Sequence, residues 1–317
     1  MSPSGGPQGD LPGVARLPDQ TPASVEPAPA SRPVDPVALA RIRQRLERSP
    51  APWLHEEVAR RMADRLSLIR QAPRRVIDWW PQGGGGASAL TVATPDAQRL
   101  SLDADGHLVA APTRWWSMAH WRGAPRQVGD TPDAREAISA DLLWANMLLH
   151  WVADPPTLLR RWHEALAVDG FLMFSTLGPG TLEALQAIHA DAGWGPPQAP
   201  FVDMHDVGDM LLEAGFADPV MDQETLTLTW ADGDAALAEL RAVGGNADPR
   251  RTRGLRTPRW RSALAERLPR ARDQRVALDF EIVYGHAVRV APRPRIEAET
   301  TVRLQDMRSI LRSRRAG

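Results

Sequence analysis

The stretch Arg75-Val-Ile-Asp-Trp-Trp-Pro-Gln-Gly-Gly-Gly-Gly86 decides how this chain can fold. Its first six residues are mostly apolar and have the length of a short buried strand. The glycine run that follows predicts a turn in which the backbone can approach a ligand closely, because glycine has no Cβ. An acid and a glycine-rich turn at the end of a first strand are typical of an open sheet that binds ligands at its strand ends.

Outward from this stretch, helix and strand patterns alternate. The apolar spacing before it predicts a helix over 54–71 that is stopped by Pro73. Strands are predicted at 98–103, 141–146, 170–176, 224–230 and 276–288, and helices at 156–167, 205–214 and 233–242. Strands separated by helices predict an α/β fold, with a mostly parallel sheet and helices on both faces.

Composition narrows the class of protein. The chain has 317 residues, of which 43% are hydrophobic, and this excludes a chain that is disordered throughout. The absence of Cys excludes disulfides, thiolate metal sites and a cysteine nucleophile. The absence of Lys excludes Schiff-base catalysis by lysine. Without an apolar run of 18 residues or an apolar signal core, we expect a cytoplasmic protein with no membrane partner. The formal charge of −1 gives no argument for nucleic acid.

Composition also divides the chain into three parts. Residues 1–36 contain nine Pro and few large apolar residues, so they are predicted to be a disordered leader. Residues 37–291 are predicted to form the folded body. Residues 292–317 are predicted to be a basic tail.

Polar residues follow several of the predicted strands, where a parallel sheet binds its ligands. Asp78 precedes the glycine run, Asp103 ends the second strand, Asp130 lies further along, and Asn146 ends the next strand. An acid in the position of Asp103 can accept hydrogen bonds from both hydroxyls of a ribose. Each residue also has an ordinary alternative, because an acid can cap a helix, an asparagine can close a turn and a glycine run can be a plain loop.

Eight segments carry a resemblance to a known family. They are Trp53-Leu-His-Glu-Glu-Val-Ala59, Arg65-Leu-Ser-Leu-Ile-Arg70, Val128-Gly-Asp130, Asp141-Leu-Leu-Trp-Ala-Asn-Met-Leu-Leu-His-Trp151, Asp169-Gly-Phe-Leu-Met-Phe-Ser-Thr176, Gly180-Thr-Leu-Glu-Ala-Leu185, Phe201-Val-Asp-Met-His205 and Leu237-Ala-Glu-Leu-Arg-Ala-Val-Gly-Gly-Asn246. Over about residues 53–290, the chain resembles the class I S-adenosylmethionine-dependent methyltransferases. More narrowly, it resembles the malonyl-[acyl-carrier-protein] O-methyltransferase family of biotin synthesis.

The resemblance implies a seven-stranded, Rossmann-like sheet whose last strand is antiparallel and inserted beside the fifth, with a lid insertion at about 231–275. It implies S-adenosyl-L-methionine as the cofactor and malonyl-acyl carrier protein as the partner, which is methylated on its free carboxyl group. It further implies that Asp103 holds the ribose hydroxyls, that Asp130 faces the adenine amino group, and that Asn146 closes the pocket after the fourth strand.

The glycine motif departs from the family pattern. Where the family has Asp-x-Gly-x-Gly-x-Gly, Trp80 and Gln82 stand in place of two glycines. A loop rebuilt downstream would bring Gly83 and Gly84 to the cofactor, and we take these two glycines and Asp78 as candidate contacts. The departure keeps a second hypothesis open, namely a non-methylating relative, either an arginine hydroxylase-like assembly factor or a catalytically silent binding protein.

At the acceptor end, His150 and Arg241 are candidate contacts to the carboxylate, and each can equally be structural. A carboxylate is already ionised at pH 7, so no catalytic base is predicted. The spacing of the eight His predicts no metal site. Residues 248–275 hold ten Arg against three acids, a net charge of +7. Such a segment can attract an acidic carrier protein, or it can be an ordinary solvated face.

Overall fold

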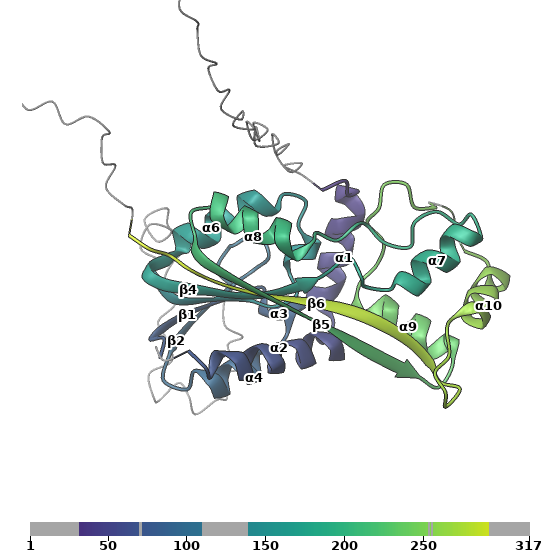
Figure 1. Ribbon diagram of the computed structural model, residues 1–317, viewed down its shortest axis with the longest axis horizontal. Coiled ribbons are helices and arrows are strands. Elements are labelled where there is room, and N and C mark those ends of the chain that lie inside the picture. Colours follow the sequence, from purple (N-terminus) through teal and green to yellow (C-terminus); the bar gives the residue numbers. More distant parts are fainter. Residues whose placement is uncertain (1–31, 70–71, 110–138, 253, 255, 292–317) are drawn as a thin grey trace, which may run out of the picture.

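The computed structural model describes residues 32–69, 72–109, 139–252, 254 and 256–291 (Figure 1). Six strands form one sheet within these residues, in the order β2-β1-β3-β4-β6-β5. They are β1 (Arg75–Trp79), β2 (Gln98–Leu102), β3 (Ala140–Ala145), β4 (Leu166–Leu177), β5 (Ala217–Trp230) and β6 (Val276–Val288). The first four pair in parallel, whereas β6 is antiparallel to both of its neighbours.

The predicted α/β fold is therefore confirmed. As expected, the last strand is antiparallel and is inserted into the sheet, between β4 and β5. The predicted number of seven strands is one more than the six that the described residues form. The helix expected over 54–71 is α2 (Trp53–Leu66), and the strand expected from 224 begins earlier, at Ala217.

Helices cover both faces of the sheet (Figure 1). One face carries α6 (Pro155–Ala165) and α8 (Met204–Glu213), and the other carries α2 and α4 (Ala87–Ala93). A third group, α7 (Glu183–Asp191), α9 (Gly233–Val243) and α10 (Pro258–Arg267), gathers beyond the sheet, beside the far ends of β5 and β6. No helix among the described residues is long and apolar enough to span a membrane.

The core lies on both faces of the sheet because side chains alternate along each strand. Leu143 and Leu172 pack into one buried cluster, together with α1, α6 and α8. Leu142 and Phe171, one residue earlier in each strand, pack into the second cluster with α2. This double-sided burial explains why the central strands are apolar throughout, as is usual in parallel sheets.

Helix α1 (Pro36–Arg48) is not among the predicted elements. Its first turn is fixed by the side chain of Asp35, which accepts hydrogen bonds from the backbone N–H groups of Val37 and Ala38. Its buried residues are Leu39, Ile42 and Leu46. Their spacing of three and four residues would have predicted a helix. The helix packs on the short α3 (Pro81–Gly84), which forms part of the glycine run.

Two of the three predicted parts of the chain lie largely outside the described residues. This holds for residues 1–31 of the leader and for the tail 292–317. Residues 32–36, at the end of the predicted leader, are described, and Arg32 donates a hydrogen bond to the backbone carbonyl of His150.

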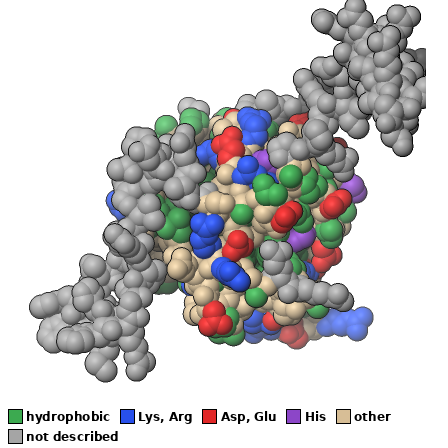
Figure 2. All heavy atoms as spheres, turned by 90° about the vertical axis from the view of Figure 1, so that its left-hand side faces the viewer, with side chains coloured by type: hydrophobic (Ala, Val, Ile, Leu, Met, Phe, Trp, Pro, Cys, Tyr) green, Lys and Arg blue, Asp and Glu red, His purple; other side chains and the backbone are tan. Residues whose placement is uncertain are grey.

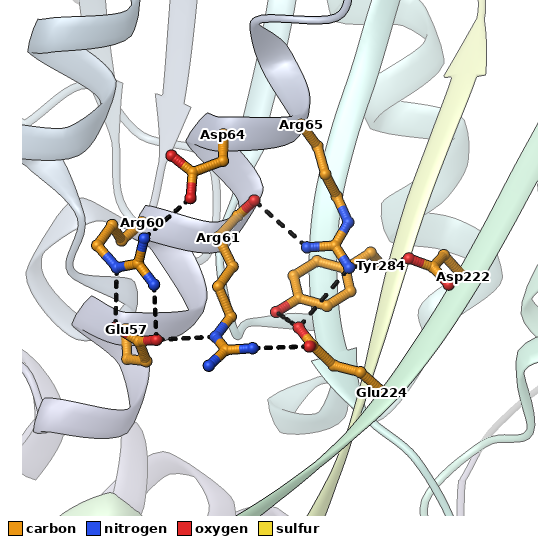
Figure 3. A network of polar contacts seen from close by, with 8 residues as sticks. All are labelled: Glu57, Arg60, Arg61, Asp64, Arg65, Asp222, Glu224 and Tyr284. Atoms are coloured by element: carbon orange, nitrogen blue, oxygen red, sulfur yellow. Dashed lines mark hydrogen bonds and ion pairs between the residues drawn. The ribbon is translucent and has the colours of Figure 1, made fainter.

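A network of charged side chains joins α2 to β5 and β6 (Figure 3). Arg61 donates to Glu224 over 2.8 Å, and the hydroxyl of Tyr284 donates to the same carboxylate over 2.7 Å. The guanidinium of Arg65 lies 3.8 Å from the centre of the Tyr284 ring and forms an ion pair with Asp222. Burial and the Glu224 carboxylate raise the pKa of Tyr284 well above its ordinary value, so the phenol stays protonated. Helix α2 is thus fixed to the antiparallel edge of the sheet, while its first turn lies beside the glycine run.

Candidate functional site

The strand order places a crevice at the ends of β1 and β3. From β1 the chain continues to β2 on one side, and from β3 it continues to β4 on the other side. The loops after these two strands therefore leave the sheet in opposite directions. Ligands bind at such a switch point in open α/β sheets. The loop after β1 is residues 80–86, and the loop after β3 leads into η2 (Leu149–Trp151).

Trp80 is the first residue of the loop after β1, and its indole is fully buried. Its backbone has φ 71° and ψ 47°, a left-handed conformation that a bulky residue rarely adopts. The indole N–H donates to the side chain of Glu47 in α1 over 2.9 Å. The ring belongs to the same buried cluster as the apolar face of α1. Trp80 stands where the family pattern has a glycine, and its side chain points beneath α1 and not into solvent.

The glycines allow this loop to pack closely against the rest of the chain. A Cβ on Gly83 would overlap the indole of Trp80, and a Cβ on Gly84 would overlap the backbone carbonyl of Asn146. Gly85 and Gly86 have φ values of 69° and 79° and pack against the first half of α2 and the residues just before it. Protein atoms thus fill the space beside Gly83 and Gly84, the two glycines predicted to contact a cofactor.

Asn146 connects the two loops of the crevice. Its amide Nδ2 donates to the carbonyl of His55 over 2.8 Å and to that of Gly84 over 2.6 Å. Its Oδ1 accepts from the hydroxyl of Ser175 over 2.7 Å. With 2% of its surface exposed, the side chain has its hydrogen-bonding groups used within the protein. Asn146 therefore holds the glycine run, α2 and β4 together at the place where the resemblance expects a pocket to close.

Two of the predicted carboxylates lie at this edge of the sheet. Asp78 is 2% exposed, and burial raises its pKa to about 7. Asp103 follows β2 and is more open, with 36% of its side chain exposed. Its Oδ1 accepts from the backbone N–H groups of Asp105 and His107. Asp130, the third predicted carboxylate, lies outside the described residues.

Two buried histidines lie beside the crevice. Nδ1 of His55 lies 2.7 Å from the carbonyl of Gly83, so this nitrogen carries the proton. Nδ1 of His150 lies 3.3 Å from the backbone N–H of Leu177 and accepts from it. Burial lowers the pKa of His55 to about 4 and that of His150 well below its ordinary value, so both rings are neutral at pH 7. Neither Nε2 has a hydrogen-bond partner among the described residues.

A cavity of about 340 Å³ lies beyond the crevice, between α1, the end of β4 and the helices α7, α9 and α10. Its walls are largely apolar and include Trp151, Leu177 and Phe280. The lining residues that the structure describes include Arg45, Arg241, Arg251 and Arg256 but no Asp or Glu. Burial and the neighbouring charge of Arg241 lower the pKa of Arg45. Two guanidinium groups therefore stand close together at this cavity, which suits an anionic group.

The structure separates the predicted contacts into two groups. Asp78, Gly83, Gly84 and Asn146 lie together at the crevice, whereas Arg241 lies at the cavity. His150 is buried behind the cavity wall, 4.9 Å from the ring of Trp151 and 5.8 Å from that of Phe201, measured between ring centres. Sequence reasoning missed Arg45, because α1 itself was not predicted.

No protein-family model matches the chain. The chain is 39% identical to the malonyl-[acyl-carrier protein] O-methyltransferase of Laribacter hongkongensis, over 81% of this chain and 91% of that protein. It is 38% identical to the enzyme of the same name from Halorhodospira halophila, over 83% of this chain and 90% of that protein. Among solved structures, it is similar to the YcgJ protein of Bacillus subtilis, with 14% identity and a TM-score of 0.43, over 73% of this chain and 98% of that one.

Proposed function

We propose a function from one premise, that the chain belongs to the malonyl-[acyl-carrier protein] O-methyltransferase family. It transfers a methyl group from S-adenosylmethionine to the free carboxyl group of malonyl-acyl carrier protein, as a step of biotin synthesis in the cytoplasm. Membership does not favour the alternative of a non-methylating relative. The observation that carries the proposal is the cavity with four arginines and no acid among its described lining residues.

The cavity suits a short acyl group that ends in a carboxylate. Its apolar walls accommodate the acyl and thioester part, and Arg45 and Arg241 supply positive charge for the carboxylate. Arg45 also donates to the backbone carbonyl of Gly244, so only part of its guanidinium faces a ligand. A looser contact suits this chemistry, because a tight bidentate pair would make the carboxylate a weaker nucleophile. The ester formed is neutral, so the arginine pair attracts the product less than the substrate.

No proton has to be moved before the reaction. The acceptor carboxylate is ionised at pH 7, and both buried histidines are neutral there. The residues of the chain therefore act by orienting the carboxylate and by excluding water. His150 contributes through its neighbours, since it supports Trp151 and Phe201 in the cavity wall.

The residues at the donor end suit S-adenosylmethionine in charge but not in space. When bound, this cofactor supplies a methyl group that is made electrophilic by a sulfonium charge. Asp78 and Asp103 suit it in charge, since Asp78 is a buried acid and Asp103 is a half-open acid after β2. The loop does not suit it in space, because the indole of Trp80 and the carbonyl of Asn146 fill the room beside Gly83 and Gly84.

We further propose that residues 231–275 form a lid and that its basic surface receives the carrier protein. Helices α9 and α10 of this segment both contribute to the cavity wall. Arg259, Arg270 and Arg272 are exposed and form no ion pair among the described residues. The end of the molecule away from α10 carries acidic and basic side chains intermixed (Figure 2). A carrier protein with an acidic surface would therefore be attracted to the α10 end.

The test is to incubate the chain with S-adenosylmethionine and malonyl-acyl carrier protein and to measure the mass of the carrier protein. We expect a methyl ester on malonyl-acyl carrier protein and none on acetyl-acyl carrier protein, which has no free carboxyl group. Absence of the ester, while the Laribacter hongkongensis enzyme forms it in a parallel reaction, would remove the proposal.

A further inference from the structure

We propose that Trp80 is a built-in occupant of the donor crevice. Its indole, held by Glu47 of α1, fills the space at the switch point that the amino-acid end of the donor needs, and α1 must shift for the donor to enter. This inference depends on the proposed function only for the choice of ligand.

The backbone of Trp80 is held in an unfavourable conformation by its surroundings. The left-handed region is unfavourable for a residue with a side chain, whereas glycine adopts it freely. Trp80 remains there because its indole is fully buried and its N–H is bonded to Glu47. Packing of the ring therefore fixes the loop, and removal of the ring would free it.

The indole also completes a seal between the two loops. Gly83 lies directly against the ring, and Gly84 lies directly against the backbone of Asn146. The Asn146 amide bonds to the carbonyls of Gly84 and His55 on the far side of this contact. Among the described residues, the two loops therefore pack directly against each other at the place where a parallel sheet binds its ligands.

Helix α1 packs over the contact between the two loops and reaches both the crevice and the cavity. Arg43 forms an ion pair of 2.8 Å with Asp105, two residues after Asp103. Glu47 bonds to Trp80, and Arg45 lies at the cavity. Asp35, which caps the helix, pairs with Arg251 over 2.8 Å. A shift of α1 that releases Trp80 therefore also changes the wall of the acceptor cavity.

Asp78 lies beneath this seal. It is 2% exposed, and burial raises its pKa against the opposing effect of the Arg99 charge. Burial makes the ionised form of a carboxyl group unfavourable. A ligand with a positively charged end would stabilise the ionised form once the indole has moved aside.

Calorimetric titration with S-adenosylhomocysteine tests the inference. We expect Trp80→Gly to bind the ligand at least about 100-fold more tightly than the unaltered chain, since the variant removes the occupant and relieves the backbone. Glu47→Ala keeps the indole but removes its hydrogen bond, and we expect it to bind about 3- to 10-fold more tightly. Trp162→Phe, which alters a buried indole of α6, is the matched control and should leave the affinity unchanged within about 2-fold.

Two further variants make the outcome decisive. Asp103→Ala in the Trp80→Gly background should abolish the gain, which assigns the new affinity to this crevice. If Trp80→Gly fails to fold, as judged by its circular dichroism, Glu47→Ala decides. Unchanged or weaker affinity in a folded Trp80→Gly variant, or in Glu47→Ala when the first variant does not fold, overturns the inference.

The same experiment separates this inference from the proposed function. Tighter binding by Trp80→Gly without a methyl ester from either chain would support the inference and remove the proposed function. Ester formation together with equal ligand affinity in both chains would overturn the inference and support the proposed function.

Discussion

The crevice after β1 and β3 and the cavity beside α9 differ in what fills them. At the crevice, Gly83 packs against an indole and Gly84 packs against Asn146, whose amide is hydrogen-bonded within the protein. At the cavity, about 340 Å³ is open, and four arginines line it with no acid among the described lining residues, although Arg251 is paired with Asp35. The described residues of the chain pack against one another at the crevice, whereas the cavity carries an excess of positive charge that an anionic ligand would balance.

The two substrates are therefore expected to bind in different ways. The acceptor enters a space that already exists, so its affinity depends on charge and shape at the cavity. The donor enters only when part of the chain moves, so its affinity is lowered by the free energy of that movement.

The largest effect concerns the buried acid at the closed region. Asp78 has its pKa raised from 3.8 to about 7, so the folded protein binds this proton more tightly than the unfolded chain does. The resulting stabilisation is fully present below about pH 4 and is lost as the pH rises through about 7. Relative to Asp78→Asn, the unaltered chain should lose about 4 kcal/mol of unfolding free energy between these limits.

Urea unfolding at a series of pH values measures this loss. Asp209→Asn, which alters an exposed acid of α8, is the control and should follow the unaltered chain throughout. Stability curves for Asp78→Asn and the unaltered chain that run parallel from pH 4 to about 7.5 would mean that water reaches Asp78, and that the crevice is open.

The next effect compares one asparagine from each region. Asn146→Ala removes three buried hydrogen bonds, and at about 1 kcal/mol for each the variant should lose about 3 kcal/mol of stability. Asn246→Ala, at the cavity wall, removes two partly buried bonds and should lose less. Equal losses in urea unfolding would show that Asn146 does not connect the loops as described.

A smaller effect is expected from the arginine pair at the cavity. Arg45→Gln and Arg241→Gln should each raise the KM for malonyl-acyl carrier protein about 10-fold, because a charge-assisted contact is lost. The KM for S-adenosylmethionine should change less than about 2-fold. Arg48→Gln, at the exposed end of α1, controls for the loss of one positive charge near the site. If Arg48→Gln raises the acceptor KM as much as Arg45→Gln does, the pair has no special role.

The smallest effect concerns the basic surface around α10. Raising the ionic strength from about 0.05 M to about 0.5 M should raise the KM for malonyl-acyl carrier protein about 3-fold, because exposed charges are screened. The double variant Arg259→Ser and Arg272→Ser should show a weaker dependence on salt. A salt dependence that is identical in the double variant would place the carrier protein elsewhere.

Much of this architecture could be predicted from the sequence, because the pattern of apolar residues determines the sheet. The strand at 75–79 and its parallel neighbours follow from apolar runs separated by helices, whereas the insertion of an antiparallel β6 was implied only by the family resemblance. Helix α1 also had a readable signal, since Asp35 and Pro36 mark its start and Leu39, Ile42 and Leu46 form its apolar stripe. It was missed because the proline-rich leader runs directly into it.

The state of the site could be predicted only in part. The sequence singled out Asp78, Asn146 and the altered glycine motif as candidates, but it could not give the direction of the Trp80 indole. That direction depends on a hydrogen bond to Glu47, a residue 33 positions earlier in the chain. The pairing of Arg45 with Arg241 likewise depends on tertiary contacts across almost 200 residues. Such contacts leave no local pattern in a single sequence.

The most direct test of the comparison is the kinetics of malonyl-acyl carrier protein methylation by the unaltered chain and by Trp80→Gly, with each substrate varied in turn. A crevice closed by the indole beside a cavity that is already open predicts two separate outcomes. The KM for S-adenosylmethionine should fall by at least about 100-fold in the variant, while the KM for malonyl-acyl carrier protein should stay within about 3-fold. An unchanged KM for S-adenosylmethionine, or equal changes in both constants, would contradict it.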